Sequence, residues 1–159
     1  MNYDGLPSAL KGMPNWTVWK WVNEEGKRRK VPYQLDGINK ARSNDPSTWT
    51  SFDRAYTAFT EAEGAFDGIC WMMPLKPGKH IFIDIDRCIK DGIMEAWAQE
   101  VVKGFNSYTE ISQSGNGIHI IIEANKPFKR CRKHGSPFEI YDSLRPCYLT
   151  GDTVEGLTE

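Results

Sequence analysis

The stretch that decides the fold is Ile81-Phe82-Ile83-Asp84-Ile85-Asp86. Side chains alternate between the two faces of a β-strand, so the three isoleucines would share one face and the two aspartates the other. The two carboxylates would lie about 7 Å apart, which is twice the rise per residue. Their repulsion at the end of an apolar strand is costly unless a cation offsets it, and oxygen ligands suit Mg²⁺ or Mn²⁺. The pattern also fits a strand that runs out into solvent, with Asp86 opening a turn.

The flanking segments predict an α/β (α+β) body with a mixed sheet, because helices and hairpins alternate along the chain. One helix would begin at the N-cap Ser51 and end at Gly64, and a second would cover residues 94–105, where apolar residues recur every three or four positions. Residues 36–49 and 127–137 read as loops. Pro32 cannot donate to a sheet ladder, so its strand should lie at an edge. The predicted strands cover residues 16–22, 30–33, 68–73, 80–86, 108–111, 118–123, 138–141 and 147–150.

The composition is that of a globular domain. The chain has 159 residues, of which 40% are hydrophobic and 26% charged, enough to bury a real core. Its apolar runs are shorter than the roughly 20 residues that span a bilayer, and residues 1–4 show no apolar signal core. Four cysteines are too few for a secreted disulfide framework. We therefore expect a cytoplasmic protein with reduced thiols and no membrane partner.

The overall charge gives no support for nucleic-acid binding, because 20 Lys and Arg stand against 21 Asp and Glu. Local clusters are basic, and both fall in predicted turns, where a solvated loop is the ordinary explanation. In a template-binding protein they would contact phosphates. Tryptophans at 16, 19 and 21 would either stack on unpaired bases or fill the core. The clusters are Lys27, Arg28, Arg29 and Lys30, and Lys126, Lys129, Arg130, Arg132 and Lys133.

Two further strands carry polar side chains where core residues are expected. Residues 112–117 form a Gly- and Ser-rich turn whose backbone N–H groups can bind an anion, and His119 follows it. Glu139 lies between apolar strand residues and shares a face with Tyr141. Alone, each has a structural explanation: a satisfied half-buried histidine and a cross-strand salt bridge. Together with the two aspartates, they describe a two-metal phosphoryl-transfer site.

The ordered set Asp84-Ile85-Asp86, Gly117-Ile118-His119 and Phe138-Glu139 resembles the three motifs of the archaeo-eukaryotic primase superfamily. It is most similar to the primase-polymerase domains of phages and plasmids. Residues 44–49, 108–119, 139–143 and 150–152 are also similar to phage-type members, so the resemblance covers about residues 16–152. Ser is common in the family where this chain has Gly117. A backbone contact, or one from Ser114, would then replace a hydroxyl contact.

The resemblance implies a single catalytic domain over residues 1–159 with a two-lobed primase-polymerase fold. An N-terminal hairpin and helix lobe would cover about residues 14–75, and a palm similar to RNA-recognition domains about 79–152. Asp84, Asp86 and Glu139 would hold two Mg²⁺ or Mn²⁺ ions. His119 would contact the phosphates of the incoming nucleotide, with Ser114, Gly115 and Arg145 as further nucleotide-binding candidates. Tyr141 or Tyr148 would sense the sugar.

The implied function is a template-dependent nucleotidyltransferase that joins nucleotides to a 3′-hydroxyl during phage or plasmid DNA replication. Its partners would be single-stranded or primed DNA, nucleoside triphosphates and, in a longer protein, a replicative helicase domain. It would act in the cytoplasm of a bacterium or of a phage- or plasmid-infected cell.

Two alternatives from other classes stay open. A non-catalytic single-stranded nucleic-acid-binding module has no need of clustered acids, which repel phosphates. A metal-dependent nuclease or rolling-circle initiator usually needs closely spaced histidines, and those at 80, 119 and 134 are not so spaced. Zinc is not expected either, because Cys131 and His134, with Cys88 or Cys147, lack a second Cys pair at the usual spacing.

Overall fold

The structure, a computed structural model, describes residues 1–127, 129–132 and 135–154. The chain divides into two compact units, each built around its own four-stranded sheet. The hairpin unit contains Ser8–Leu75 and Leu144–Leu149. The palm unit contains Met1–Pro7, Lys76–Ser143 and the described residues from Thr150 onward. The segment 144–149, which we expected in the palm, thus belongs to the hairpin unit.

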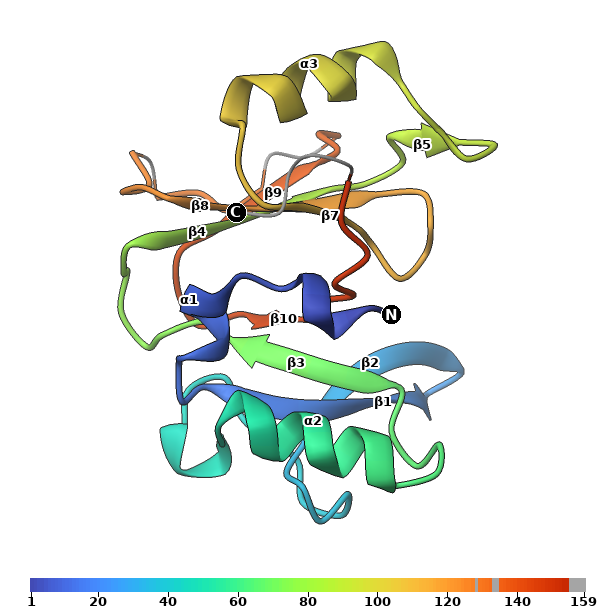
Figure 1. Ribbon diagram of the computed structural model, residues 1–159, viewed down its shortest axis with the longest axis vertical. Helices are drawn as coiled ribbons and strands as arrows, with labels where there is room; N and C mark the ends of the chain where they lie inside the picture. The colour runs from blue at the N-terminus through green and yellow to red at the C-terminus, as the bar shows by residue number, and fades with distance from the viewer. Residues whose placement is uncertain (128, 133–134, 155–159) are drawn as a thin grey trace. The chain divides into compact units, whose positions relative to one another are not determined.

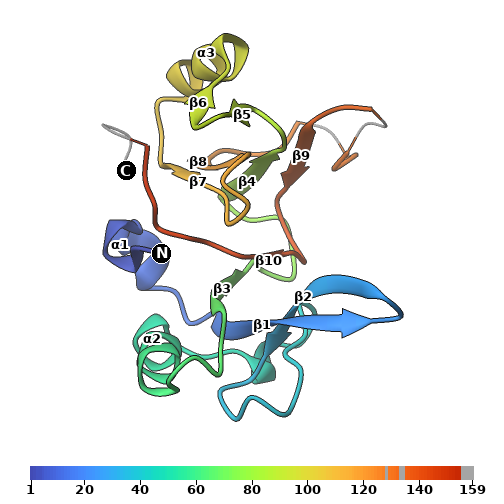
Figure 2. The same ribbon diagram turned by 90° about the vertical axis from the view of Figure 1, so that its right-hand side faces the viewer.

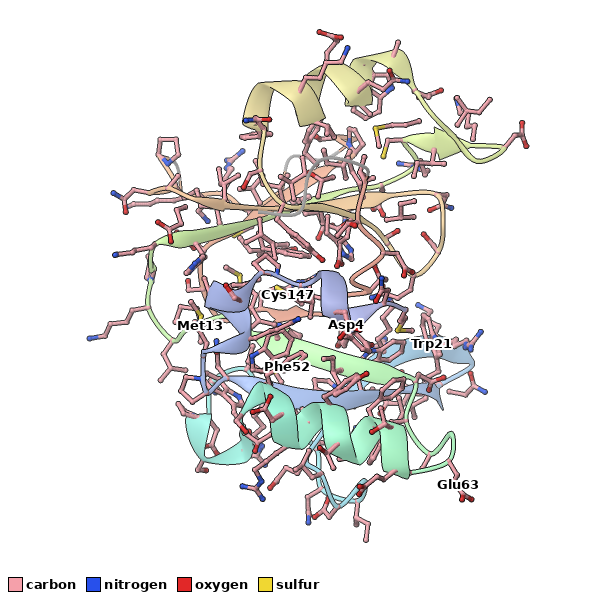
Figure 3. All side chains as sticks on the ribbon, in the orientation of Figure 1. Asp4, Met13, Trp21, Phe52, Glu63 and Cys147 are labelled. Carbon is pink, nitrogen blue, oxygen red and sulfur yellow. The ribbon has the colours of Figure 1, made fainter. Side chains whose placement is uncertain are left out.

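The sheet of the hairpin unit has the strand order β10-β3-β1-β2, and α2 packs against one of its faces (Figure 2). Ser51 caps α2 by accepting a hydrogen bond from the Arg54 amide, as predicted. Phe52 then packs edge-on against Trp16, with ring centroids 5.1 Å apart, and Figure 3 shows it between α2 and the sheet. Pro32 lies on the edge strand β2, also as predicted. The elements are α1 (Ser8–Lys11), β1 (Trp16–Glu24), β2 (Lys27–Tyr33), the 3₁₀ helix η2 (Pro46–Thr48), α2 (Phe52–Glu61), β3 (Gly68–Met72) and β10 (Pro146–Cys147).

The turn between β1 and β2 is tighter than the sequence suggested. Glu25 and Gly26 both have positive φ values, 51° and 74°, which is the backbone of the two-residue turns that fit twisted hairpins. The strand therefore begins at Lys27, and the four consecutive cations lie in β2 and not in a turn. Within β1, the residues that pair with β3 are Trp16–Trp19, so the rest of the hairpin continues as a two-stranded ribbon.

The palm unit contains a second sheet, with the strand order β7-β8-β4-β9 (Figure 1). Every strand pairing among the described residues is antiparallel, so the α+β class is confirmed but the expected mixed sheet was wrong. The crossover through α3 does make β7 run in the same direction as β4, but β8 lies between them. The elements are the 3₁₀ helix η1 (Tyr3–Gly5), β4 (His80–Ile85), β5 (Ile89–Lys90), β6 (Ile93–Met94), α3 (Ala96–Phe105), β7 (Thr109–Ile111), β8 (Ile118–Glu123) and β9 (Phe138–Tyr141).

Helix α3 begins at Ala96 and not at Met94, because Met94 pairs with Ile89 in the short β5–β6 hairpin. The helix lies over one face of the palm sheet (Figure 1). That face is apolar: the alternating isoleucines of β4 and β8 pack there against Ala98 and Val102. The residues that alternate with these isoleucines, among them Asp84 and His119, therefore point to the opposite face of the sheet. No helix in the described part of the chain is both long and apolar enough to span a bilayer.

The two ends of the palm unit lie together beside β7. The Ile111 amide donates to the Asp152 carbonyl at 2.9 Å, and the Asn2 amide donates to the Thr150 carbonyl at 2.8 Å. Gly151 makes this approach possible, because it has a φ of 69° and a Cβ there would lie 2.1 Å from the Asn2 carbonyl oxygen. The segment after β10 therefore closes against the edge of the palm sheet.

Candidate active site

Four polar residues form a row across the palm sheet on the face opposite α3. Glu110, His119, Asp84 and Glu139 are successive cross-strand partners on β7, β8, β4 and β9. Directly opposed residues in such a ladder have Cβ atoms about 4.5–5.5 Å apart. The structure therefore brings together three residues that the sequence singled out on separate strands, and it adds Glu110 to them.

Asp84 lies at the centre of the row and Asp86 just beyond the end of β4. The Asp84 side chain is 24% exposed, and Asp86 is exposed in the turn that follows. The ladder nevertheless continues one residue past β4, because the Asp86 amide donates to the Pro137 carbonyl at 3.0 Å. Asp86 is therefore next to the row and not a member of it.

Glu139 lies at the end of the row opposite Glu110, on the edge strand β9, and its side chain is 12% exposed. Its Oε1 lies 2.9 Å from Nη1 of Arg132, and its Oε2 accepts a hydrogen bond from the Tyr141 hydroxyl. Arg132, which we expected to contact template phosphates, is thus placed on a candidate metal ligand. The Glu139 carboxylate is therefore already paired with a side-chain cation.

His119 is buried between two acids. Its Nδ1 lies 2.7 Å from Oε1 of Glu110, and its Nε2 lies 3.9 Å from Oδ1 of Asp84. The Phe82 ring packs on it with a centroid distance of 5.0 Å. The sequence offered His119 either as a phosphate or metal contact or as a satisfied half-buried histidine, and it did not identify Glu110 as the partner of Nδ1.

Glu110 is the residue that reasoning from the sequence missed. It is fully buried, and its carboxylate accepts hydrogen bonds from Tyr108 and from two backbone amides. Burial, followed by the neighbouring Glu110 charge, raises the pKa of Tyr108 well above its ordinary value. The available indication was the run Tyr108-Thr109-Glu110-Ile111, in which an acid interrupts an apolar strand as Glu139 does.

The side chains of the glycine-rich turn, residues 112–117, hydrogen-bond to one another. The Ser114 hydroxyl lies 3.0 Å from that of Ser112 and donates to Oδ1 of Asn116 at 2.5 Å. Gly115 has a φ of 73° with open space around its Cα. Gly117 is confined instead: a Cβ would lie 2.7 Å from the Ile85 carbonyl oxygen, so a Ser at this position would require the backbone to shift.

The donor chemistry of the row suits a divalent cation, although the described residues contain no ready-made ligand set. Asp84 and Glu139 are direct partners on one face, and carboxylate oxygens are what Mg²⁺ and Mn²⁺ prefer. No group of three or more His, Cys, Asp or Glu residues within the described ranges is gathered closely enough to hold a metal. An ion bound by Glu139 would have to displace Arg132 from that carboxylate.

No protein-family model matches the chain. It is 31% identical over 154 residues, 93% of its length, to a DNA primase-polymerase of Nitratiruptor phage NrS-1. The chain resembles a phage-type primase-polymerase, as its motifs predicted. It spans about a fifth of the length of this curated relative, of which 20% is covered.

The other predicted site residues are divided between the two units. Arg145 and Tyr148 belong to the hairpin unit, where the Tyr148 hydroxyl donates to the Lys30 carbonyl at 3.0 Å. Lys129 and Arg130 are exposed, whereas Lys126 is almost fully buried and pairs with Asp142 at 3.3 Å. Lys133 lies outside the described residues.

The cysteines that were weighed for a zinc site differ in exposure. Cys88 and Cys147 are buried, and the Cys131 thiol accepts a hydrogen bond from Nζ of Lys126 at 3.3 Å. His134, the other residue weighed for zinc, lies outside the described ranges.

Proposed function

We propose that this chain is the catalytic part of a template-dependent nucleotidyltransferase, a DNA primase-polymerase that joins nucleotides to a 3′-hydroxyl in phage or plasmid DNA replication. The observation that carries the proposal is the row itself. Asp84, His119 and Glu139 come from the three strands that bear the family motifs, and Asp84 is the direct cross-strand partner of both of the others. The similarity to a phage primase-polymerase over 93% of the chain supports the same conclusion.

In this proposal Asp84, Asp86 and Glu139 hold two Mg²⁺ or Mn²⁺ ions. The chemistry that such ions supply when bound is activation of the 3′-hydroxyl and neutralisation of the departing pyrophosphate. His119 would contact a nucleotide phosphate through Nε2, its ring atom nearer Asp84. Because phosphate oxygens only accept hydrogen bonds, this contact needs a proton on Nε2 as well as the one on Nδ1. Ser114, Gly115 and Arg145 remain candidates for further phosphate contacts, and Tyr141 or Tyr148 for the sugar.

The hairpin supports a proposed template contact. Strand alternation places Arg28 and Lys30 on the face of Trp21, and Lys27 and Arg29 on the opposite face. The Arg28 guanidinium lies 4.4 Å from the Trp21 ring centroid, and Nζ of Lys30 lies 5.5 Å from it. Figure 3 shows Trp21 on this hairpin. Aromatic rings among cations are what single-strand-binding surfaces use to stack bases and hold phosphates.

Primer extension tests the catalytic proposal. The protein is incubated with primed and unprimed single-stranded DNA, nucleoside triphosphates and Mg²⁺ or Mn²⁺. Asp84→Asn and Glu139→Gln keep the side-chain shapes but remove the charges, and each should slow extension by about 100-fold or more. Asp91→Asn, in the exposed β5–β6 turn, is the matched control and should not. Full extension by either site variant would refute the metal assignment.

The same assay separates the alternatives. A wild-type protein that binds single-stranded DNA tightly but extends no primer would be a binding module. Cleavage of the template without synthesis would indicate a nuclease or initiator. Either result would overturn the polymerase proposal.

Two double variants with equal charge test the template surface. Each double variant removes two cations from one face of β2. Arg28→Ala/Lys30→Ala changes the face that contains Trp21, and Lys27→Ala/Arg29→Ala changes the opposite face. The first pair should weaken single-stranded DNA binding more, because it also disrupts the cluster around Trp21. Equal losses would mean that only the net charge of the hairpin matters.

A further inference from the structure

Glu110 is a fully buried carboxylate that the proposed chemistry does not use. Four groups point at its two oxygens. The Tyr108 hydroxyl donates at 2.6 Å, the Gly151 amide at 2.8 Å and the Thr150 amide to both oxygens at 3.1 Å. The fourth is Nδ1 of His119 at 2.7 Å. A carboxylate has about four lone-pair sites, so its accepting capacity is used up.

These contacts determine which ring nitrogen of His119 carries a proton. An ionised carboxylate only accepts hydrogen bonds, so the nitrogen that faces it at 2.7 Å must be the donor. The other nitrogen, Nε2, is then directed toward Asp84 at 3.9 Å. The second ring nitrogen of a functional histidine is commonly held by a carboxylate in this way.

The carboxylate is itself held from outside the strand that carries it. Thr150 and Gly151 belong to the segment that closes against β7, and Glu110 forms an isolated bridge with Thr153 of the same segment. Phe82 packs against the His119 ring at 5.0 Å and limits its rotation. The ring therefore has one well-defined orientation, provided that the closing segment stays in place.

We propose that Glu110 is a positioning residue: it keeps a proton of His119 on Nδ1 and directs Nε2 at the candidate active site, with the segment Thr150–Gly151 holding Glu110. The catalytic consequence rests on the function proposed above. The proton position does not, so the two can be tested apart.

The first test needs only the wild-type protein. A long-range ¹H–¹⁵N correlation spectrum at neutral pH distinguishes protonated from unprotonated ring nitrogens, and His119→Gln assigns the resonances. We expect Nδ1 to be protonated. A ring that carries its only proton on Nε2 would overturn the proposal, whether or not the protein makes DNA.

The second test uses Glu110→Gln, which keeps the shape of the side chain. Its control is Glu123→Gln on β8, an identical change at a residue 3.7 Å from His80. Near-ultraviolet circular dichroism first confirms that both variants fold. We expect Glu110→Gln to lower kcat/KM for the nucleotide by about 10–100-fold, as lost carboxylate partners of functional histidines do. Template affinity and the control should be unchanged.

A double-mutant cycle separates positioning from stability. In a His119→Gln background, Glu110→Gln should cause no further loss of kcat/KM, because the ring that it positions is gone. An equal loss in both backgrounds, or wild-type efficiency in a folded Glu110→Gln protein, would refute a positioning role. If the wild-type protein makes no product, or if Glu110→Gln does not fold, the spectrum of the wild-type ring decides.

Discussion

Replacing Gly117 by Ala should destabilise the palm unit, because the backbone there leaves no room for a methyl group. A Cβ would lie 2.7 Å from the Ile85 carbonyl oxygen, 3.1 Å from the Ser112 hydroxyl and 3.5 Å from Cα of Asp86. Two of these atoms belong to the backbone at the end of β4, so rotating a side chain cannot relieve the contact. The change must therefore move the end of β4, which carries Asp84 and leads directly into Asp86.

Overpacking of this kind costs about 1–3 kcal/mol. In a chain of this size each kcal/mol lowers the melting temperature by about 2–4 °C, so Gly117→Ala should melt about 2–12 °C below the wild type. Thermal and urea unfolding followed by circular dichroism would measure the loss. Gly117→Ser should lose at least as much, because its hydroxyl needs further space.

Gly104→Ala provides the matched control. Gly104 lies in α3, and a Cβ there would meet nothing within 4 Å. Since Ala favours a helix over Gly by about 0.5–1 kcal/mol, this variant should be slightly more stable than the wild type. If Gly117→Ala is as stable as Gly104→Ala, β8 does not approach the end of β4 as closely as described, and the reasoning fails.

Three further predictions concern the core, the thiols and alkaline pH. Ile83→Ala should cost about 2–5 kcal/mol in urea unfolding, because Ile83 is 2% exposed under α3, whereas Ile38→Ala at an 80% exposed site should stay within about 0.5 kcal/mol. In a thiol titration with DTNB, half-buried Cys131 should react first and the three buried cysteines only on unfolding; a fast phase that survives Cys131→Ser would contradict this. Burial raises the pKa of Tyr148, so the unfolded chain loses that proton first, and the stabilisation present below about pH 10 should decline above it. Unfolding measured against pH should show a shallower decline for Tyr148→Phe; an unchanged slope would exclude this tyrosine as its source.

Local patterns were the most reliable guide to the secondary structure. The strands at 118–123 and 138–141 have the predicted bounds, and Ser51 caps α2. Alternation and capping depend only on near neighbours in the chain, so one sequence suffices to predict them. The early helix α1 and the β5–β6 hairpin were missed, since four and two residues are too few to show a period.

The cations of the hairpin show where local reasoning stops. Lys27–Lys30 look like a solvated turn, but the two-residue turn at Glu25–Gly26 draws them into β2. Strand geometry then divides them between two faces, and only one of these faces contains Trp21. Charge counting alone could not make that distinction.

For the candidate site, the sequence by itself determined which side chains of each strand point away from its apolar face. Asp84, His119 and Glu139 are polar at positions whose parity is opposite to that of the packed isoleucines, and parity is a property of a single strand. What only the tertiary structure decided is the register between strands. The register makes these three residues one row, adds Glu110 at its buried end and places Arg132 on Glu139. Those contacts join residues distant in sequence through backbone ladders and a closing segment, and no local pattern along the chain encodes them.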